Sequence, residues 1–221
     1  MKITFVRPNL YDDRSSDAME PLCFAILKSL TPADIDVELY DERLEEIPFD
    51  IDTDLVAMTV ETYTARRAYQ IADRFRRRGI CVVMGGYHPT FLPEETLERA
   101  DAIVRGDAED SWPTLLDDVR NNALQRIYES PEFPVLDGHM PDRSIFDGKK
   151  YGPMGLVQYS RGCRFNCTFC SIRAFYGSNL RQRPVEQVAE DIRRSGKRHF
   201  FIVDDNLFID TEKSRQLFEA L

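Results

Sequence analysis

The sequence predicts an α/β protein: a Rossmann-like, doubly wound parallel sheet followed by the start of a second β/α unit. Short apolar runs alternate with segments of helical periodicity from the first residue onward, the pattern of a parallel sheet covered by helices. A stretch rich in proline and glycine interrupts this alternation at residues 129–152. The predicted units are therefore a front domain (1–128), a linker (129–152) and a rear segment (153–221).

Five short apolar runs predict the strands of the front domain: Ile3–Val6, Ile35–Tyr40, Leu55–Val60, Ile80–Met84 and Ala102–Val104. The clearest helix is expected from about Thr62, where apolar residues recur at helical spacing and arginines fall between them. Pro93 and Ser111 are expected to begin two further helices, because proline and a capping hydroxyl both suit the free amides of a first turn.

The rear segment repeats the pattern. A strand is predicted at Leu156–Tyr159, a helix from about Pro184 to Ser195, a strand at His199–Val203 and a last helix from Thr211. Strand and helix again alternate, so the predicted strands are parallel.

Composition narrows the possible functions. The 221 residues are 43% hydrophobic and 30% charged, enough for one core and the beginning of a second. The net charge of −9 argues against a nucleic-acid or anionic-membrane surface, and the arginines between residues 66 and 78 are interpreted as a solvated helix face. No apolar run is long enough to span a membrane and no signal peptide is evident, so a cytoplasmic location is expected.

Three of the five cysteines form one cluster in the sequence. Cys163, Cys167 and Cys170 directly follow a predicted strand, and α/β folds place their chemistry at the carboxyl ends of strands. Three thiolates on a [4Fe-4S] cluster leave one iron open for a substrate's amino and carboxylate groups. The alternatives are a zinc site completed by His199 and three unrelated buried cysteines. Cys23 and Cys81 are interpreted as small buried hydrophobic residues.

This cysteine motif, with aromatic Phe169 before its last cysteine, resembles the signature of radical S-adenosylmethionine (SAM) enzymes. The resemblance implies that Phe169 lies against the adenine of SAM. Simple packing of the loop is the alternative role for this side chain.

A polar tripeptide, Asp204, Asp205 and Asn206, follows the predicted strand at residues 199–203. These groups are expected to open toward the cysteines and to accept hydrogen bonds from the SAM ammonium group or ribose hydroxyls; a turn capped by asparagine is the alternative. The tripeptide is similar to that of the cobalamin-binding branch of radical SAM enzymes. Arg181 and Arg183 are candidates for steering a carboxylate or for an ordinary surface loop.

The strand ends of the front domain resemble a cobalamin-binding domain. Thr59, Gly85 and Gly86 match that family's hydroxyl residue after the third strand and its glycine pair after the fourth. The histidine-containing element Asp-x-His-x-x-Gly is absent from the first loop, at residues 9–14. Either the cobalt lacks a protein histidine here or the domain no longer binds the cofactor. His88 is considered as a corrin contact, with a turn role as its alternative.

Together the resemblances imply a Rossmann-like domain followed by a radical SAM barrel. From Tyr151 onward only 71 residues remain, about two strand–helix units of roughly 30 residues each, so an incomplete barrel, and a truncated gene or fragment, is expected. The implied cofactors are a [4Fe-4S] cluster, SAM and cobalamin.

The implied reaction is reductive cleavage of SAM and cobalamin-dependent methylation of an unactivated carbon. Radical rearrangement or cyclisation without methyl transfer, and a non-catalytic cobalamin- or metal-binding fragment, are the alternatives. The expected partners are a small-molecule or peptide substrate and a one-electron reductant protein. No residue identifies the substrate, and no catalytic side chain is assigned.

Overall fold

The computed structural model describes residues 1–10, 13–15 and 18–221. Its front sheet has six parallel strands in the order β2-β1-β3-β4-β5-β6. The strands are β1 (Lys2–Arg7), β2 (Asp36–Asp41), β3 (Leu55–Thr59), β4 (Cys81–Gly85), β5 (Ala102–Arg105) and β6 (Ile127–Glu129). The first five match the predicted runs. The sequence analysis missed β6, which has three residues and buries only Tyr128.

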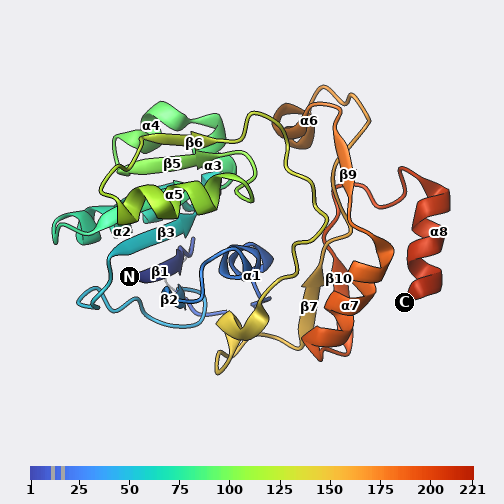
Figure 1. The fold of residues 1–221 in the computed structure, drawn as a ribbon, viewed down its shortest axis with the longest axis horizontal. Coiled ribbons are helices and arrows are strands. Elements are labelled where there is room, and N and C mark those ends of the chain that lie inside the picture. Colours follow the sequence, from blue (N-terminus) through green and yellow to red (C-terminus); the bar gives the residue numbers. More distant parts are fainter. Residues whose placement is uncertain (11–12, 16–17) are drawn as a thin grey trace.

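Helices cover both faces of this sheet (Figure 1), as the doubly wound prediction requires. The helices of the front domain are α1 (Leu22–Ser29), α2 (Ala65–Arg76), α3 (Tyr87–Phe91), α4 (Pro93–Leu97) and α5 (Ser111–Arg120). Phe24 and Trp112, from α1 and α5, pack against Phe5 on one face. Ile71 and Phe75 of α2 belong to the core on the other face. A 3-10 turn at Thr62–Thr64 precedes α2.

The segment between residues 129 and 152 has little regular structure but is not a free tether. Its 3-10 turn, Arg143–Phe146, inserts Ile145 and Phe146 into the core that surrounds Phe5. The backbone amide of Asp142 also donates a 2.9 Å hydrogen bond to the carbonyl of Ala25 in α1. We call residues 129–152 the connecting segment from here on.

The rear segment contains a parallel pair, β7 (Met154–Val157) with β10 (His199–Ile202), and an antiparallel pair, β8 (Ser160–Gly162) with β9 (Leu180–Gln182). Its helices are α6 (Ser171–Tyr176), α7 (Val185–Ser195) and α8 (Thr211–Ala220). The parallel pair, α7 and α8 were predicted. The antiparallel pair and α6 were not, because three-residue strands and a six-residue helix carry no measurable periodicity.

A small core of Val157, Tyr159, Val188 and Leu217 holds the rear segment together. Phe201 and Phe208 remain exposed, at 55% and 66% of their surface, as expected for two strand–helix units that do not close into a barrel. In Figure 1 this segment stands beside the front domain, joined through the connecting segment.

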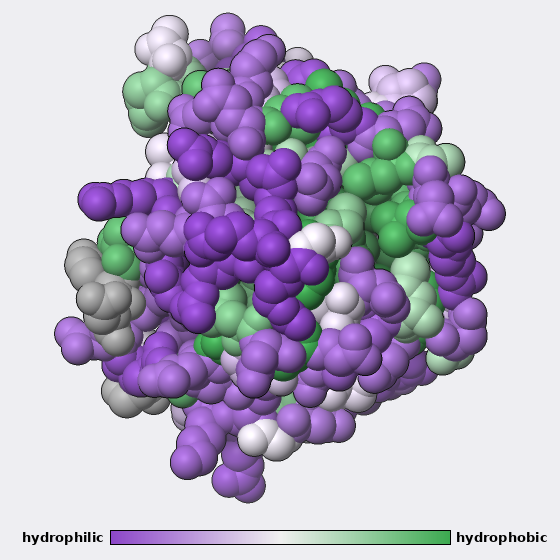
Figure 2. All heavy atoms as spheres, turned by 90° about the vertical axis from the view of Figure 1, so that its left-hand side faces the viewer, coloured by the Kyte–Doolittle hydropathy of each residue, from purple (hydrophilic) through white to green (hydrophobic). Residues whose placement is uncertain are grey.

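The surface of the front domain is largely polar, in line with the 30% of charged residues in the sequence. Most arginines between residues 66 and 78 are exposed, and the face of the front domain shown in Figure 2 is mainly hydrophilic. Among the described residues, no helix is long and apolar enough to cross a membrane.

Candidate functional site

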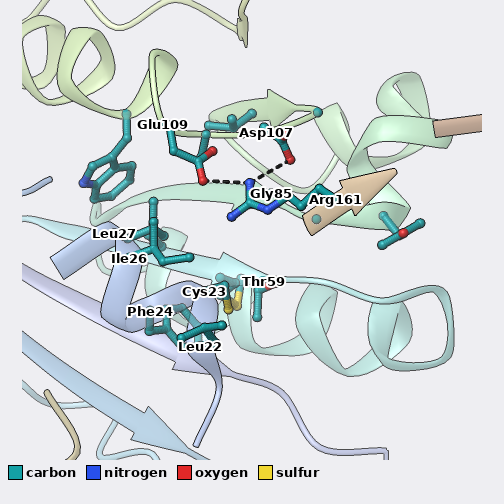
Figure 3. A pocket seen from close by; sticks show the side chains of 18 of the residues that line it. Leu22, Cys23, Phe24, Ile26, Leu27, Thr59, Gly85, Asp107, Glu109 and Arg161 are labelled. Carbon is teal, nitrogen blue, oxygen red and sulfur yellow. Dashed lines mark ion pairs between the residues drawn. The ribbon is translucent and has the colours of Figure 1, made fainter. Parts of the chain in front are cut away.

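A cavity of about 300 Å³ lies at the carboxyl ends of β3, β4 and β5 (Figure 3). The floor is apolar and includes Phe24, Ala57, Val83 and Trp112. Residues of the rear segment, among them Arg161, Phe175 and Tyr176, complete the lining. The cavity therefore occupies the position where open parallel sheets bind ligands, and both halves of the chain contribute to its wall.

Three of the residues predicted to contact cobalamin line this cavity: Thr59, Gly85 and Gly86. Gly86 has a φ of 105°, and a Cβ atom there would lie 3.0 Å from the carbonyl oxygen of Val60. Glycine is therefore required at this turn. Because Gly86 lets the chain leave β4 sharply, the floor of the cavity stays open.

His88 does not line the cavity, and its contact with a corrin stays a prediction. Its side chain is buried, with Nε2 2.8 Å from the hydroxyl of Tyr69 and 3.5 Å from Oε1 of Glu95. The short helix α3 turns His88 toward α2 and α4, away from the mouth of the cavity.

Cys23 was predicted to be a buried core residue, and the structure corrects this. Its side chain is accessible within the cavity and lies beside Thr59 (Figure 3). The surrounding protein desolvates the thiol and raises its pKa above the ordinary value. Cys81 is half-buried at the start of β4, where burial raises its pKa to about 11.

A charged cluster closes one side of the cavity. Arg161 Nη1 lies 2.7 Å from Oε1 of Glu109 and 3.2 Å from Oδ1 of Asp107, while Arg181 Nη1 lies 2.6 Å from Oδ2 of Asp107. The hydroxyl of Tyr176 donates to Asp107 at 3.3 Å. Burial lowers the pKa of Arg161, but Glu109 and Asp107 outweigh this effect and hold the pKa above its usual value.

The sequence analysis did not anticipate this cluster. The available signal was that Asp107 and Glu109 follow β5 while Arg161 precedes the first loop cysteine by two residues. Arg181 and Arg183 were considered as carboxylate-steering or surface residues, and both are instead internal ion-pair partners. Arg183 Nη1 lies 3.1 Å from Oδ2 of the buried Asp191.

The cysteine loop leaves β8 at Gly162 and ends where α6 begins. Cys163 and Cys170 are half-buried and Cys167 is exposed, with no helix or strand between them. Gly162 has a φ of 87°, and a Cβ there would lie 1.9 Å from the carbonyl oxygen of Asn179. The loop thus starts from a glycine that the pairing of β8 with β9 requires.

The tripeptide after β10 forms hydrogen bonds with the residues that lead into this loop. It was expected to lie close to the cysteines. Asp204 Oδ1 accepts from the amide of Tyr159 at 2.8 Å, and Asp204 Oδ2 accepts from the hydroxyl of Ser160 at 2.5 Å. Asp205 Oδ2 accepts from the amide of Gly162 at 2.7 Å. Burial raises the pKa of both carboxyl groups despite these hydrogen bonds. These oxygens thus already bind the protein's own donors; contact with SAM stays a prediction.

Phe169 is 90% exposed at the loop tip. So little of this side chain is covered that loop packing alone gives it a small buried area. Its proposed contact with adenine stays a prediction.

The donor chemistry of the loop fits an iron–sulfur cluster better than zinc. His199 is exposed at the start of β10. Across the described ranges, no three His, Cys, Asp or Glu side chains converge on a position for a single ion. Three thiols from one loop are the donor set that an iron–sulfur cluster takes, whereas the histidine considered for a zinc site lies outside the loop, at the start of β10.

Fold and site define a class of protein: a Rossmann-like ligand-binding domain whose cavity adjoins a three-cysteine loop on a second β/α unit. Residues 26–116 match the model of the B12 binding domain. The chain is 37% identical to the bacteriochlorophyllide d C-8(2)-methyltransferase of Chlorobaculum tepidum, covering 95% of this chain and 50% of that protein. It is 31% identical to the anaerobic magnesium-protoporphyrin IX monomethyl ester cyclase of Rubrivivax gelatinosus, over 76% of this chain and 36% of that protein.

Solved structures agree on the fold. The radical S-adenosylmethionine methyltransferase TsrM from Kitasatospora setae, solved with cobalamin and a [4Fe-4S] cluster bound, aligns with a TM-score of 0.73 at 16% identity, covering 99% of this chain and 51% of TsrM. The chain belongs to the family of radical SAM proteins that carry a B12-binding domain. It spans 50% of the length of the first of these two curated relatives and 36% of the second.

Proposed function

We propose that this chain contributes the cobalamin and cluster sites of a radical SAM methyltransferase. Cys163, Cys167 and Cys170 would hold a [4Fe-4S] cluster, and the cavity over β3, β4 and β5 would hold part of a cobalamin. When bound, the cluster supplies the electron that cleaves SAM, and the cobalamin supplies the methyl group for an unactivated carbon.

One observation carries the proposal. Arg161 lines the cavity and pairs with Asp107 and Glu109 of the front domain, yet it lies only two residues before Cys163. The two predicted cofactor sites are therefore next to each other. A reaction that uses both cofactors on one substrate needs this proximity, whereas two independent binding sites would not.

The residues of the cavity fit part of a corrinoid. Its volume is at the lower end of the roughly 300–1,000 Å³ typical of ligand pockets, so a molecule as large as cobalamin would extend beyond it. Apolar side chains would exclude water from the enclosed part. Thr59 places a hydroxyl at the end of β3, and Gly86 keeps the turn beside it narrow.

The charged and aromatic side chains around the cavity and the cysteine loop have separate roles in the proposal. Asp204 and Asp205 fix the strand that leads into the cysteine loop. Arg161 and Arg181 neutralise the carboxylates beside the cavity, and Phe169 is free to cover an adenine ring.

A small-molecule or peptide substrate and a one-electron reductant protein complete the proposed system. The names of the Chlorobaculum tepidum and Rubrivivax gelatinosus relatives favour a tetrapyrrole as substrate.

A second function is favoured by one specific relative. The cyclase of Rubrivivax gelatinosus is 31% identical to this chain, and a ring-forming reaction would use the same sites without methyl transfer. Transfer of label from the methyl group of SAM to product distinguishes the two reactions.

Anaerobic purification followed by iron, sulfide and corrin analysis tests the proposed cofactors. About four irons per chain and stoichiometric corrin binding are expected. Cys23→Phe should fill the cavity and reduce corrin binding while leaving iron unchanged, because Cys23 faces the cavity and is not one of the predicted cluster ligands. Cys81→Phe, at the opposite end of the sheet, is the control for cavity filling. Wild-type protein that binds neither cofactor would overturn the proposal.

A further inference from the structure

The tripeptide after β10 makes four contacts with the chain that leads into the cysteine loop. Three of them involve Asp204 and Asp205 and reach only backbone amides and one hydroxyl. The fourth reaches a sulfur: Nδ2 of Asn206 lies 3.9 Å from Sγ of Cys163. Asn206 thus differs from the two aspartates, since it contacts a predicted cluster ligand directly.

The orientation of the Asn206 amide is set by the chain. Its Oδ1 accepts a 3.2 Å hydrogen bond from the backbone amide of Phe208. Because that backbone group can only donate, the oxygen must face it, and the NH₂ group must face Cys163. Rotating the amide by half a turn would place two donors against each other.

This contact is asymmetric within the loop. Within the part of the chain that the structure describes, Cys163 is the one loop cysteine whose sulfur receives a side-chain donor. Hydrogen bonds to the sulfurs are among the factors that set the reduction potential of an iron–sulfur cluster. They withdraw electron density from the thiolate, so they stabilise the reduced, more negative cluster more than the oxidised one.

We propose that Asn206 is a positioning residue that raises the reduction potential of the cluster by donating an N–H···S hydrogen bond to Cys163. This inference rests on the proposed function, since it requires the cluster. It assigns Asn206 to the sulfur of Cys163, in place of the SAM contact expected from the sequence. The consequence is an easier electron transfer from the reductant to the cluster.

The test compares Asn206→Ala and Asn206→Asp with wild type, using the midpoint potential of the one-electron [4Fe-4S] couple from an EPR-monitored titration. Both variants lose the donor to Cys163, while aspartate still accepts from Phe208. Both should shift the potential to more negative values, by about tenfold in the reduction equilibrium, which is about 59 mV for one electron. Ser160→Ala is the matched control, because it removes a neutral donor to Asp204 and touches no sulfur.

The possible results distinguish a failure of the role given to Asn206 from a failure of the proposed function. Lower potentials in both Asn206 variants, with full iron content and an unshifted Ser160→Ala, support the inference. A shift in Asn206→Asp alone would assign the effect to the added charge and overturn it, as would unchanged potentials. Iron loss in both Asn206 variants would overturn it in favour of a purely structural role. Wild-type protein without a cluster would overturn the proposed function itself.

Discussion

Arg161 of the rear segment and Glu109 of the front domain form a buried ion pair, with Nη1 of the arginine 2.7 Å from Oε1 of the glutamate. Glu109 is 5% exposed. The pair lies where the cavity meets the strand that leads into the cysteine loop. It therefore ties the position of the predicted cluster to the position of the predicted corrinoid.

Breaking this pair should destabilise the protein strongly. Arg161→Met leaves Glu109 buried without its cation and Asp107 with one arginine partner instead of two. Removing one member of a buried pair typically costs about 3–5 kcal/mol, and urea unfolding should show a loss of that order. Replacing both members, in Arg161→Met/Glu109→Leu, should recover part of the loss. A loss well under 1 kcal/mol in the single variant would contradict the role given to the pair.

Gly162 should tolerate no side chain. Gly162→Ala combines a φ of 87° with a Cβ that would lie 1.9 Å from the carbonyl oxygen of Asn179. Separation of β8 from β9 is expected, with a large loss of thermal stability and of iron after reconstitution. Gly196→Ala is the control: Gly196 is left-handed, with a φ of 64° and a ψ of 4°, and nothing lies within 4 Å of its Cβ, so only the backbone strain of roughly 1–2 kcal/mol applies. Equal effects in the two variants would disprove the steric argument.

Each of the three loop cysteines should be required for the cluster. Cys163→Ala, Cys167→Ala and Cys170→Ala are each expected to abolish a four-iron cluster, measured as iron and sulfide per chain. Cys23→Ala and Cys81→Ala should leave iron content unchanged, since Cys23 lies in the cavity and the thiol of Cys81, with a pKa of about 11, stays protonated at neutral pH. Iron retained in all three loop variants would rule out the assigned ligands.

Long elements could be predicted from the sequence, while short ones could not. β1 and α2 were predictable because Ile3–Val6 form a continuous buried apolar run and Ile71 and Phe75 lie four residues apart, at helical spacing. By contrast, β8 and β9 have three residues each, so their pairing depends on a tertiary contact between Gly162 and Asn179 that no local pattern reveals.

The residues of the candidate site also fall into two groups, those that the sequence could suggest and those that it could not. Spacing made the three cysteines candidate ligands, and resemblance to a cobalamin-binding domain made Thr59, Gly85 and Gly86 candidates for the cavity that they line. Sequence could not distinguish an aspartate that binds a ligand from one that binds the chain, as Asp205 binds Gly162. Nor could it show that α3 turns His88 toward Tyr69. Both depend on side-chain direction in three dimensions.

Stability should decrease as the pH rises through the range in which Asp204 and Asp205 ionise. Burial raises both pKa values above the ordinary 3.8, so the folded state binds protons more tightly than the unfolded state. The resulting stabilisation is present below pH 3.8 and is lost as the pH rises through the raised values. In Asp204→Asn/Asp205→Asn this decrease should be smaller, measured as the free energy of urea unfolding between pH 4 and 8. An identical pH profile in the variant would contradict the prediction.

Limited proteolysis should cut the connecting segment at one place without separating the two halves. Residues 131–133, 137–138 and 147–148 are exposed, and Ile145 and Phe146 lie in the front core, so cleavage is expected first between 131 and 138, away from these two buried side chains. A free linker would instead be cut anywhere from 129 to 152, with early loss of the rear segment. The structure instead joins the rear segment to the front domain by buried charges.

Glu20 is central to that junction, because its carboxylate lies 3.5 Å from Nη1 of Arg143 and 2.6 Å from Nζ of Lys197. After cleavage the two wild-type fragments should co-elute in gel filtration at the size of the intact chain. In the Glu20→Gln/Arg161→Met/Arg181→Met variant the fragments lose these ion pairs and the pair of Arg181 with Asp107, but keep the apolar contacts of Ile145 and Phe146. Their association should weaken and the rear fragment should be degraded faster than in wild type. The control is Arg120→Met, whose partner Asp34 is exposed and lies within the front domain; its fragments should stay together. If wild-type fragments separate as soon as they are cut, the ion pairs do not hold the halves together and the adjacency of the two cofactor sites depends on the intact connecting segment.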